Sequence, residues 1–411
     1  METPQEKPAA APRPRPAARK ASPARKTAPA KRRSTGGKKK KKRKLRSPFM
    51  RLMRALMLIL SIAAAVSLFC TAYAGNISPL KHGGLYGILP LCFPFVIYCS
   101  VALLVLQVWW HWRGVVIIAL GLLASAGPVL QVCPLNLGTP QAPEGSDTFK
   151  LMTYNVFHLY EPRDSTDTVP NRMLDYVIEN DPDIVCFQEA ITLGAKKPYF
   201  ITPEQVQTLH TKYPYIIKSA GQQMIMSKYP VQPIHLSLTR EEFQNAELAA
   251  YRITFPGGKM ATLFNVHLQS LGLNQNDREL YKNLTDLQRE NLGAVKQQLI
   301  GKLSFANVER ARQTQALLRL IRHYGGPNVL ICGDFNDVAT CYALRTLEDT
   351  GFRSAYAELG FGPMITYNSG RFYFCIDHVL YRGDFTPLEI KKGTLRASDH
   401  YPLTATFALG K

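Results

Sequence analysis

Polar side chains that could carry out hydrolytic chemistry follow an apolar run in the C-terminal part of the sequence. The run NVLIC (328–332) leads into Gly333, and Asp334, Asn336 and Asp337 come directly after it. Carboxylates and an amide at the mouth of an apolar strand are costly to bury unless something binds them. We therefore expect this strand end to hold a ligand.

The same pattern recurs at other apolar runs. Its further members are Asn155 after LMTY, Glu189 after DIVCFQ, His267 after MATLFNV, Asp377 inside FCIDHVLY, and Asp399 and His400 in SDHYPL. One such residue alone is usually a cap or a turn former, but strand ends gather at one edge of a sheet, where sites form. A set of oxygen ligands and imidazoles with no cysteine among them favours Mg²⁺ or Mn²⁺ over a structural zinc.

The elements that must position these side chains alternate between strand and helix patterns. Apolar runs predict strands at 150–155, 183–189, 223–227, 260–267, 328–336, 374–381 and 403–409. Helices are expected at about 170–180, 204–212 and 340–349, and the Gln- and Arg-rich segment 278–323 is typical of one or two amphipathic helices. This alternation predicts an α/β domain over 149–411.

A series of short motifs in this domain resembles the endonuclease/exonuclease/phosphatase superfamily, which has the DNase I-like fold. In chain order they are TYNV (153–156), PDIVCFQE (182–189), MSKYP (226–230), NVHLQS (265–270), GDFND (333–337), IDHVLY (376–381) and SDHYPL (398–403). Each motif is short, but all of them in the family's order are specific. The resemblance implies a four-layer α/β sandwich, with two packed sheets and helices outside, and metal-dependent hydrolysis of phosphate esters.

The resemblance also implies a metal site and its ligands. Glu189 would be the main ligand of a catalytic Mg²⁺ or Mn²⁺, Asn155 would help to orient it, and Asp399 would be a further carboxylate on the metal side. A bound cation neutralises charge on the phosphate and supplies an activated water, which is what phosphoryl chemistry needs.

The remaining motif residues are implied to act on the phosphate. Asp334 would align or deprotonate the attacking water, and Asn336 would bind a phosphate oxygen. His400 would contact the scissile phosphate while Asp377 fixes its ring and raises its basicity. His267 would bind the substrate and either stabilise the transition state or assist the leaving group. Amide and imidazole donors of this kind stabilise charge that develops on phosphate oxygens.

Two neighbours of these residues have a structural explanation. Asp337 belongs either to the ligand site or, equally well, to the N-terminal cap of the helix expected to begin near Ala339. His378 directly follows Asp377 on a predicted strand, so its side chain should point to the opposite face of the sheet and pack there.

The N-terminal part of the sequence is strongly basic. The chain of 411 residues has a net charge of +20, of which residues 1–54 carry +18, so the remainder is nearly neutral at +2. Residues 8–44 have almost no large apolar side chains, and the basic tail (1–50) is expected to be disordered. The run KKKKKRK (38–44) would attract anionic lipid or nucleic acid, or would serve only to set the membrane topology.

Three uncharged stretches follow at 55–74, about 85–108 and about 114–132, each long enough to cross a bilayer. They predict three transmembrane helices within 51–132, a Pro- and Gly-rich linker at 133–148, and a membrane-anchored member of bacterial type. The basic residues should keep the N-terminus cytoplasmic, which places the catalytic domain on the outer side. If only two segments cross, because Pro90 and Pro94 weaken the second, the domain would be cytoplasmic.

The expected activity is hydrolysis of a phosphodiester by metal-assisted in-line attack of water. The substrate is left open between nucleic acid and a phospholipid headgroup. A nearly neutral domain does not favour a dedicated nuclease, because such enzymes usually carry a basic face. The alternative is a catalytically silent, membrane-anchored binding module of the same fold. The oligomeric state cannot be predicted.

Overall fold

The computed structural model describes residues 48–161, 169–194, 198–219, 221–237, 239, 247–271, 292–369 and 372–410. Residues Pro48–Lys411 form one compact unit. The predicted disordered tail (1–50) lies outside the described residues except for residues 48–50. Of the basic segment 278–323, residues 278–291 also lie outside them. The tail therefore stays a prediction, as does the division of the chain at 133–148.

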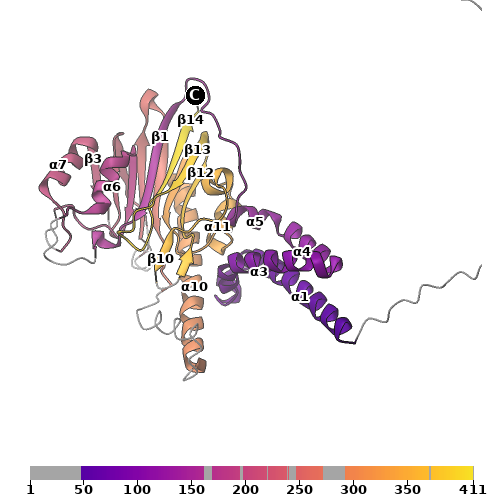
Figure 1. Ribbon diagram of the computed structural model, residues 1–411. Coiled ribbons are helices and arrows are strands. Elements are labelled where there is room, and N and C mark those ends of the chain that lie inside the picture. Colours follow the sequence, from indigo (N-terminus) through magenta and orange to yellow (C-terminus); the bar gives the residue numbers. More distant parts are fainter. Residues whose placement is uncertain are drawn as a thin grey trace, which may run out of the picture. The chain divides into compact units, whose positions relative to one another are not determined.

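The catalytic part contains two six-stranded sheets (Figure 1). The first has the order β13 (Phe385–Lys392), β14 (Leu403–Leu409), β1 (Asp147–Asn155), β2 (Ile184–Gln188), β4 (Met224–Ser227) and β3 (Tyr215–Lys218). The second has the order β5 (Val231–Ile234), β6 (Glu247–Thr254), β7 (Met260–His267), β8 (Val329–Asp334), β12 (Asp377–Arg382) and β9 (Arg353–Ser354). A small hairpin of β10 (Tyr367–Ser369) and β11 (Phe372–Phe374) stands apart from both sheets.

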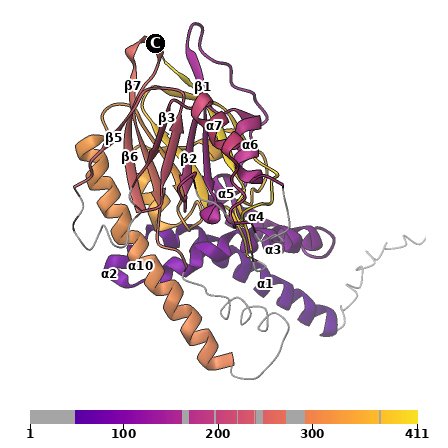
Figure 2. The same ribbon diagram turned by 90° about the vertical axis from the view of Figure 1, so that its left-hand side faces the viewer.

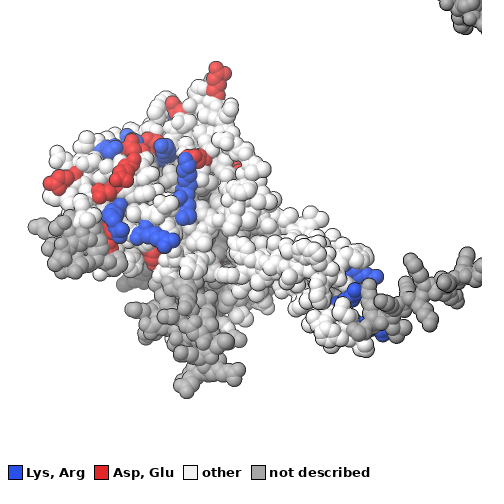
Figure 3. Space-filling view, in the orientation of Figure 1, with Lys and Arg blue, Asp and Glu red and all other residues white. Residues whose placement is uncertain are grey.

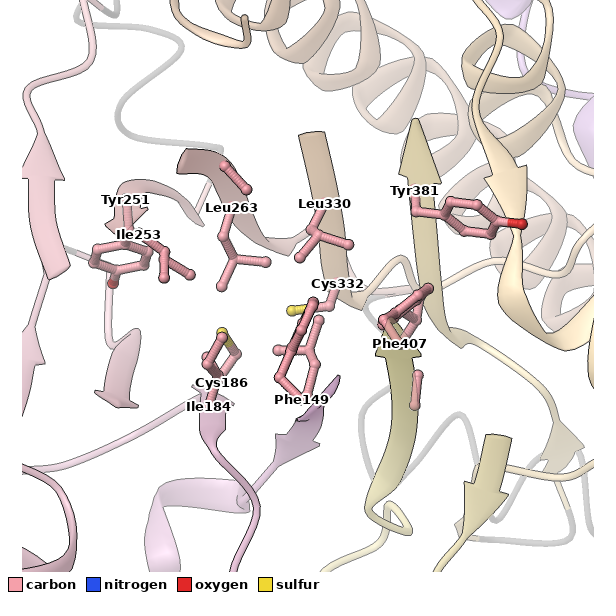
Figure 4. Packing of buried hydrophobic residues seen from close by; sticks show 14 of the residues in the cluster. Phe149, Ile184, Cys186, Tyr251, Ile253, Leu263, Leu330, Cys332, Tyr381 and Phe407 are labelled. Carbon is pink, nitrogen blue, oxygen red and sulfur yellow. The ribbon is translucent and has the colours of Figure 1, made fainter. Parts of the chain in front are cut away.

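The central strands are apolar on both faces because each sheet is covered on both sides. In β8, Leu330 and Cys332 belong to the cluster between the sheets, whereas Val329 and Ile331 belong to the cluster under the helices. This is the period of two expected for a strand. In Figure 4, Leu330 of the second sheet lies opposite Phe149 of the first, in the layer between the sheets.

Helices cover the outer face of each sheet. On the first sheet, α6 (Arg172–Asn180) and α7 (Pro203–Lys212) bury Leu174 and Leu209 against it. On the second, α10 (Leu292–Tyr324) and α11 (Tyr342–Glu348) bury Leu317 and Leu344 in the same way. Figure 2 shows α10 beside the strands of the second sheet. The predicted four-layer α/β sandwich of DNase I-like type is confirmed.

The predicted helices and strands of this domain are present, with small shifts at their ends. The helix α6 begins after Asn171, whose side chain accepts hydrogen bonds from two backbone amides, and α7 begins with a capping box between Thr202 and Gln205. The segment 292–323 falls within one long helix, α10, and a short helix α12 (Ala355–Leu359) follows β9. The strands that periodicity did not predict are β3, β5, β6, β9, β10, β11 and β13.

The N-terminal part is a set of apolar helices: α1 (Pro48–Tyr73), α3 (Leu89–Trp110), α4 (Trp112–Ala124) and α5 (Ala126–Val132). Three short helical segments connect α1 to α3: η1 (Ala74–Asn76), α2 (Pro79–His82) and η2 (Tyr86–Ile88). Among the described residues, two helices are long and apolar enough to cross a membrane; α4 and α5, bent by 73°, would form a third span if they act together. On the face drawn in Figure 3, the surface of these helices is almost free of charge away from one end.

Candidate active site

The predicted site residues converge because of how the strands pair. The pairs β1–β2 and β7–β8 are parallel, so their C-terminal ends lie at the same edge of the two sheets. In the second sheet, His267 of β7 is in register with Asp334 of β8, which is in register with Asp377 at the start of the antiparallel β12. Asn155 ends β1, and Glu189 follows directly after β2.

Asn155 joins the two sheets at this edge. Its Nδ2 donates one hydrogen bond to Glu189 Oε1 and one to Asp334 Oδ2, both 3.1 Å long. Asn155 and Asp334 are buried, whereas the Glu189 side chain is 23% exposed. Glu189 has a positive φ of 52°, which is uncommon for a non-glycine residue and turns the chain sharply after β2. The amide therefore holds the two carboxylates close together.

His400 lies between two further carboxylates. Its Nδ1 is 2.9 Å from Asp377 Oδ2, and its Nε2 is 3.4 Å from Asp334 Oδ2. Burial lowers the pKa of His400, but the charges of Asp377 and Asp334 outweigh burial and raise this pKa to about 10. Ser398 fixes the loop, because its hydroxyl donates to the Asn155 carbonyl and accepts from the His400 amide. The two carboxylates thus favour the protonated ring of His400, which is suited to contact an anion.

His267 is held by a residue that sequence reasoning missed. Its Nδ1 is 2.7 Å from Glu247 Oε2, and its Nε2 lies 3.7 Å from Glu189 Oε1 and 3.8 Å from Asp334 Oδ2. Burial lowers the pKa of His267, but the hydrogen bond to Glu247 and the charges of Asp334 and Glu247 raise it to about 8. Glu247 is in register opposite His267 across the β6–β7 hairpin. The hairpin's Pro-Gly-Gly turn (256–258) could have indicated this pairing.

Asn336 and Asp337 make different contacts from those expected. Asn336 has a φ of 50°, and its Nδ2 donates to the Leu268 carbonyl at 3.0 Å, so this group is engaged rather than turned to a phosphate. The Asp337 side chain accepts from Arg310 Nε at 3.1 Å. Because α11 begins only at Tyr342, the predicted capping role of Asp337 for a helix starting near residue 339 is wrong.

The site surrounds a cavity of about 120 Å³, here called the active-site cavity. Its walls include six of the predicted residues: Glu189, His267, Asp334, Asn336, Asp399 and His400. Tyr367 also lines it, with its ring centroid 4.9 Å from that of His400. Asn155 and Asp377 lie behind this wall and hold Glu189, Asp334 and His400 in place. A larger cavity of about 670 Å³ around Tyr356 and Arg396 contains none of the predicted residues.

The donor atoms fit a hard divalent cation. Among the described residues, ligand atoms of Asp334, Asp377 and His400 lie within 4.8 Å of one another. His400 is already held by both carboxylates, so its ring suits phosphate contact better than metal coordination. Glu189 and Asp399 line the same cavity, and none of the described residues of its wall is a cysteine. Carboxylate oxygens of this kind suit Mg²⁺ or Mn²⁺.

The sequence from residue 152 to residue 400 matches the model of the Endonuclease/Exonuclease/phosphatase family. The chain belongs to this family. The matched range holds every predicted site residue, from Asn155 to His400, so the resemblance inferred from short motifs is confirmed. None of the curated proteins matches the sequence.

Solved structures of the endonuclease/exonuclease/phosphatase family are similar at low identity. One from Beutenbergia cavernae DSM 12333 is 16% identical with a TM-score of 0.43, covering 64% of this chain and 72% of that one. One from Bacteroides vulgatus is 16% identical with a TM-score of 0.42, and the match covers 64% of this chain and 99% of that one. Truncated Caenorhabditis elegans TDP2 is 18% identical with a TM-score of 0.39, and the match covers 64% of this chain and 97% of that one. At such scores the family assignment rests on the match over 152–400.

Proposed function

We propose that this protein is a membrane-anchored, divalent-metal-dependent phosphodiesterase. The observation that carries the proposal is the grouping of Glu189 and Asp334, joined by Asn155, with the two held imidazoles of His267 and His400 around one cavity. Carboxylates would bind a cation there, and imidazoles would meet the substrate's anionic oxygens. A phosphodiester needs both kinds of group.

Glu189 would hold the metal, with Asn155 orienting its carboxylate and Asp399 contributing from the wall of the same cavity. When bound, Mg²⁺ or Mn²⁺ would neutralise charge on the phosphate and help to activate water. Asp334 would align the water and accept its proton. Its position between Asn155 Nδ2 at 3.1 Å and His400 Nε2 at 3.4 Å fixes the carboxylate for this task.

The two histidines would act on the phosphate from different elements. His400, protonated and held by Asp377, would donate a charged hydrogen bond to a non-bridging oxygen. His267, whose Nδ1 is bound to Glu247, would direct its Nε2 to the leaving-group oxygen and supply a proton to it. Asn336 would bind a phosphate oxygen only after its amide leaves the Leu268 carbonyl.

Membrane anchoring is part of the proposal and is supported by two apolar helices and one bent pair. The N-terminus would be cytoplasmic, with the catalytic domain on the outer side. The basic tail would contact anionic lipid or nucleic acid, and this stays a prediction because it lies outside the described residues.

The test uses the full chain in detergent with bis-p-nitrophenyl phosphate and p-nitrophenyl phosphate as substrates. We expect turnover that EDTA abolishes and Mg²⁺ or Mn²⁺ restores, with the diester preferred. Glu189→Gln and His400→Ala should each lower kcat/KM on the order of 10²–10³-fold, the effect typical of removing one charge-stabilising group. Glu179→Gln, on the exposed face of α6, is the matched control and should retain activity.

Absence of turnover in a folded, metal-loaded chain would overturn the phosphodiesterase proposal. It would favour the alternative of a silent binding module. Turnover that is unaffected by EDTA would contradict the metal dependence alone.

A further inference from the structure

The active-site cavity is not enclosed by the catalytic domain alone. Leu91 of α3 lines it, together with Phe157, Leu271, Phe374 and Ile376. Leu91 is 8% exposed and lies in the first turn of α3. This helix is one of the two candidates to span a membrane. One wall of the cavity that holds the catalytic residues is therefore apolar and partly built by a membrane helix.

A second cavity of about 140 Å³, here called the apolar cavity, adjoins the first. Phe374 stands in the wall of both. The other wall residues come from α3 (Phe95), from α5 (Val132) and from the catalytic domain (Met364 and Ile365 among them), and none of its described wall residues is Lys, Arg, Asp or Glu. The Phe95 and Phe374 ring centroids are 6.1 Å apart in an edge-on contact. A chain of apolar side chains thus leads from the phosphate site to the membrane helices.

The apolar cavity lies at a surface that suits hydrocarbon. Phe95 and Tyr98 of its wall are each 51% exposed on α3. Nearby, Phe361 is 66% exposed and Tyr373 is 50% exposed. Exposed apolar side chains gathered in this way mark a surface that contacts a membrane or a partner. Because α3 is itself a candidate span, we take this surface to face lipid.

The contact between helices and catalytic domain is specific. Asn307 of α10 donates through Nδ2 to the Gly84 carbonyl at 2.8 Å, and Gln131 Nε2 donates to both carboxylate oxygens of Glu348 at 2.7 Å. A Cβ atom at Gly75 would overlap the backbone carbonyl of Thr340. These contacts fix the start of α3, and Leu91 with it, against the catalytic residues.

We propose that the substrate is a membrane phospholipid, with its phosphodiester among Glu189, His267 and His400 and one hydrocarbon chain in the apolar cavity. This inference rests on the proposed phosphodiesterase function. A water oxygen would bond to phosphorus, the P–O bond to one ester alcohol would break, and that alcohol would take up a proton. The products are a phosphomonoester and an alcohol.

The experiment compares a lipid with a soluble diester on the same protein. The full chain is reconstituted with Mg²⁺ in vesicles containing dioleoyl phosphatidylethanolamine, phosphatidylglycerol, phosphatidylcholine and sphingomyelin, and new phosphomonoester is measured by ³¹P NMR. Bis-p-nitrophenyl phosphate and a single-stranded oligonucleotide are assayed in parallel. Val132→Trp fills the apolar cavity, and Leu130→Trp, on the same helix but outside the cavity and 45% exposed, is the matched control.

We expect hydrolysis of at least one of these lipids. Val132→Trp should lower the lipid rate about tenfold or more, because two lost CH₂ contacts already account for that factor. The rate on the soluble diester should fall far less, and Leu130→Trp should resemble the wild type in both assays. If Val132→Trp does not fold, Phe95→Ser, which makes the same wall polar, replaces it.

The outcomes separate the two proposals. Turnover of the soluble diester or of the oligonucleotide, with every lipid intact, overturns the lipid inference and leaves the phosphodiesterase standing. Lipid hydrolysis that Val132→Trp and Leu130→Trp affect equally overturns the role of the apolar cavity. Failure on all substrates removes the phosphodiesterase proposal and the inference with it.

Discussion

Two adjacent residues of β12 show how environment decides what a side chain can do. Asp377 points to the active site and holds His400, whereas His378 packs edge-on against Phe335 with ring centroids 5.5 Å apart. His378 Nε2 lies 3.0 Å from the Asp337 carbonyl. Alternation along a strand predicted this opposite orientation from sequence alone. The two histidines consequently differ in pKa, one near 10 and the other near 4.

The buried His378 should make stability fall in acid. Burial lowers its pKa from 6.5 to about 4, outweighing the hydrogen bond to Asp337. The folded state favours the neutral ring, so its contribution is complete above pH 6.5 and is lost as the pH falls toward 4. Between pH 7 and pH 5 this loss is about 2 kcal/mol. His378→Gln keeps a donor for the carbonyl and should show a correspondingly smaller loss, measured by calorimetry of the detergent-solubilised chain.

The control for this titration is His210→Gln, at an exposed position on α7. It should keep the acid sensitivity of the wild type. Equal acid sensitivity in His378→Gln and the wild type would show that another group is responsible.

At the scale of elements, the sequence predicts strands and helices wherever one face is continuously apolar. The central strands β1, β2, β7 and β8 are recognisable because both of their faces are buried. Edge strands such as β13, where no two consecutive residues are buried, give a weak pattern, and two- or three-residue strands such as β9 give too short a one. The polar residues at strand ends stand out in the sequence, whereas the contact of Glu247 with His267 depends on the register of the β6–β7 hairpin, which only its Pro-Gly-Gly turn could have indicated.

The long helix α10 is fastened to the site by a buried ion pair. Arg310, 1% exposed, donates from Nε to Asp337 Oδ2 at 3.1 Å and from Nη1 to the Gln269 carbonyl at 3.0 Å. Asp337 lies three residues after Asp334, and Asn307, which also contacts Arg310, reaches the loop at Gly84. Sequence reasoning saw this arginine only as one of many on a basic segment, since its partner is distant in the chain.

Removing this arginine should destabilise the protein strongly. Arg310→Met leaves the Asp337 carboxylate buried without its cation, which typically costs about 3–5 kcal/mol of the free energy of unfolding. Arg312→Met is the matched control on the same helix. The Arg312 side chain is 57% exposed and pairs with Glu309, so its loss should cost less than about 1 kcal/mol. Both are measured by denaturant unfolding in detergent, and equal effects would contradict the structural role of Arg310.

At the scale of the whole molecule, the helices and the catalytic domain form one unit rather than an enzyme on a tether. The apolar stretches at 55–74, 85–108 and 114–132 are largely helical, and two of the helices are long and apolar enough to cross a membrane. The sequence could not predict that the second span would supply Leu91 to the active-site cavity, because that depends on how α3 packs against β11 and the loop around Ile376. The same contacts bear on which side of the membrane the catalytic domain occupies.

The loop between α1 and α3 contacts the catalytic domain directly, through Gly84 with Asn307 and through Gly75 beside Thr340. The domain must then lie on the same side of a membrane as this loop. If only α1 and α3 crossed, the chain would leave α3 on the other side. We therefore predict that the bent pair α4–α5 returns the chain, giving three crossings. Because basic residues before α1 favour a cytoplasmic N-terminus, the loop and the domain should both be outside.

Protease access to tagged full-length protein tests this arrangement. In cells whose outer barrier has been removed but whose cytoplasmic membrane is intact, external protease should remove a C-terminal tag and spare an N-terminal one. A soluble cytoplasmic protein in the same cells is the control for membrane integrity and should stay intact. A C-terminal tag that is lost only after detergent would place the domain in the cytoplasm. A cytoplasmic domain would agree with its contacts to the α1–α3 loop only if the N-terminus lay outside, despite the 20 basic residues in 1–54. External protease would then remove the N-terminal tag.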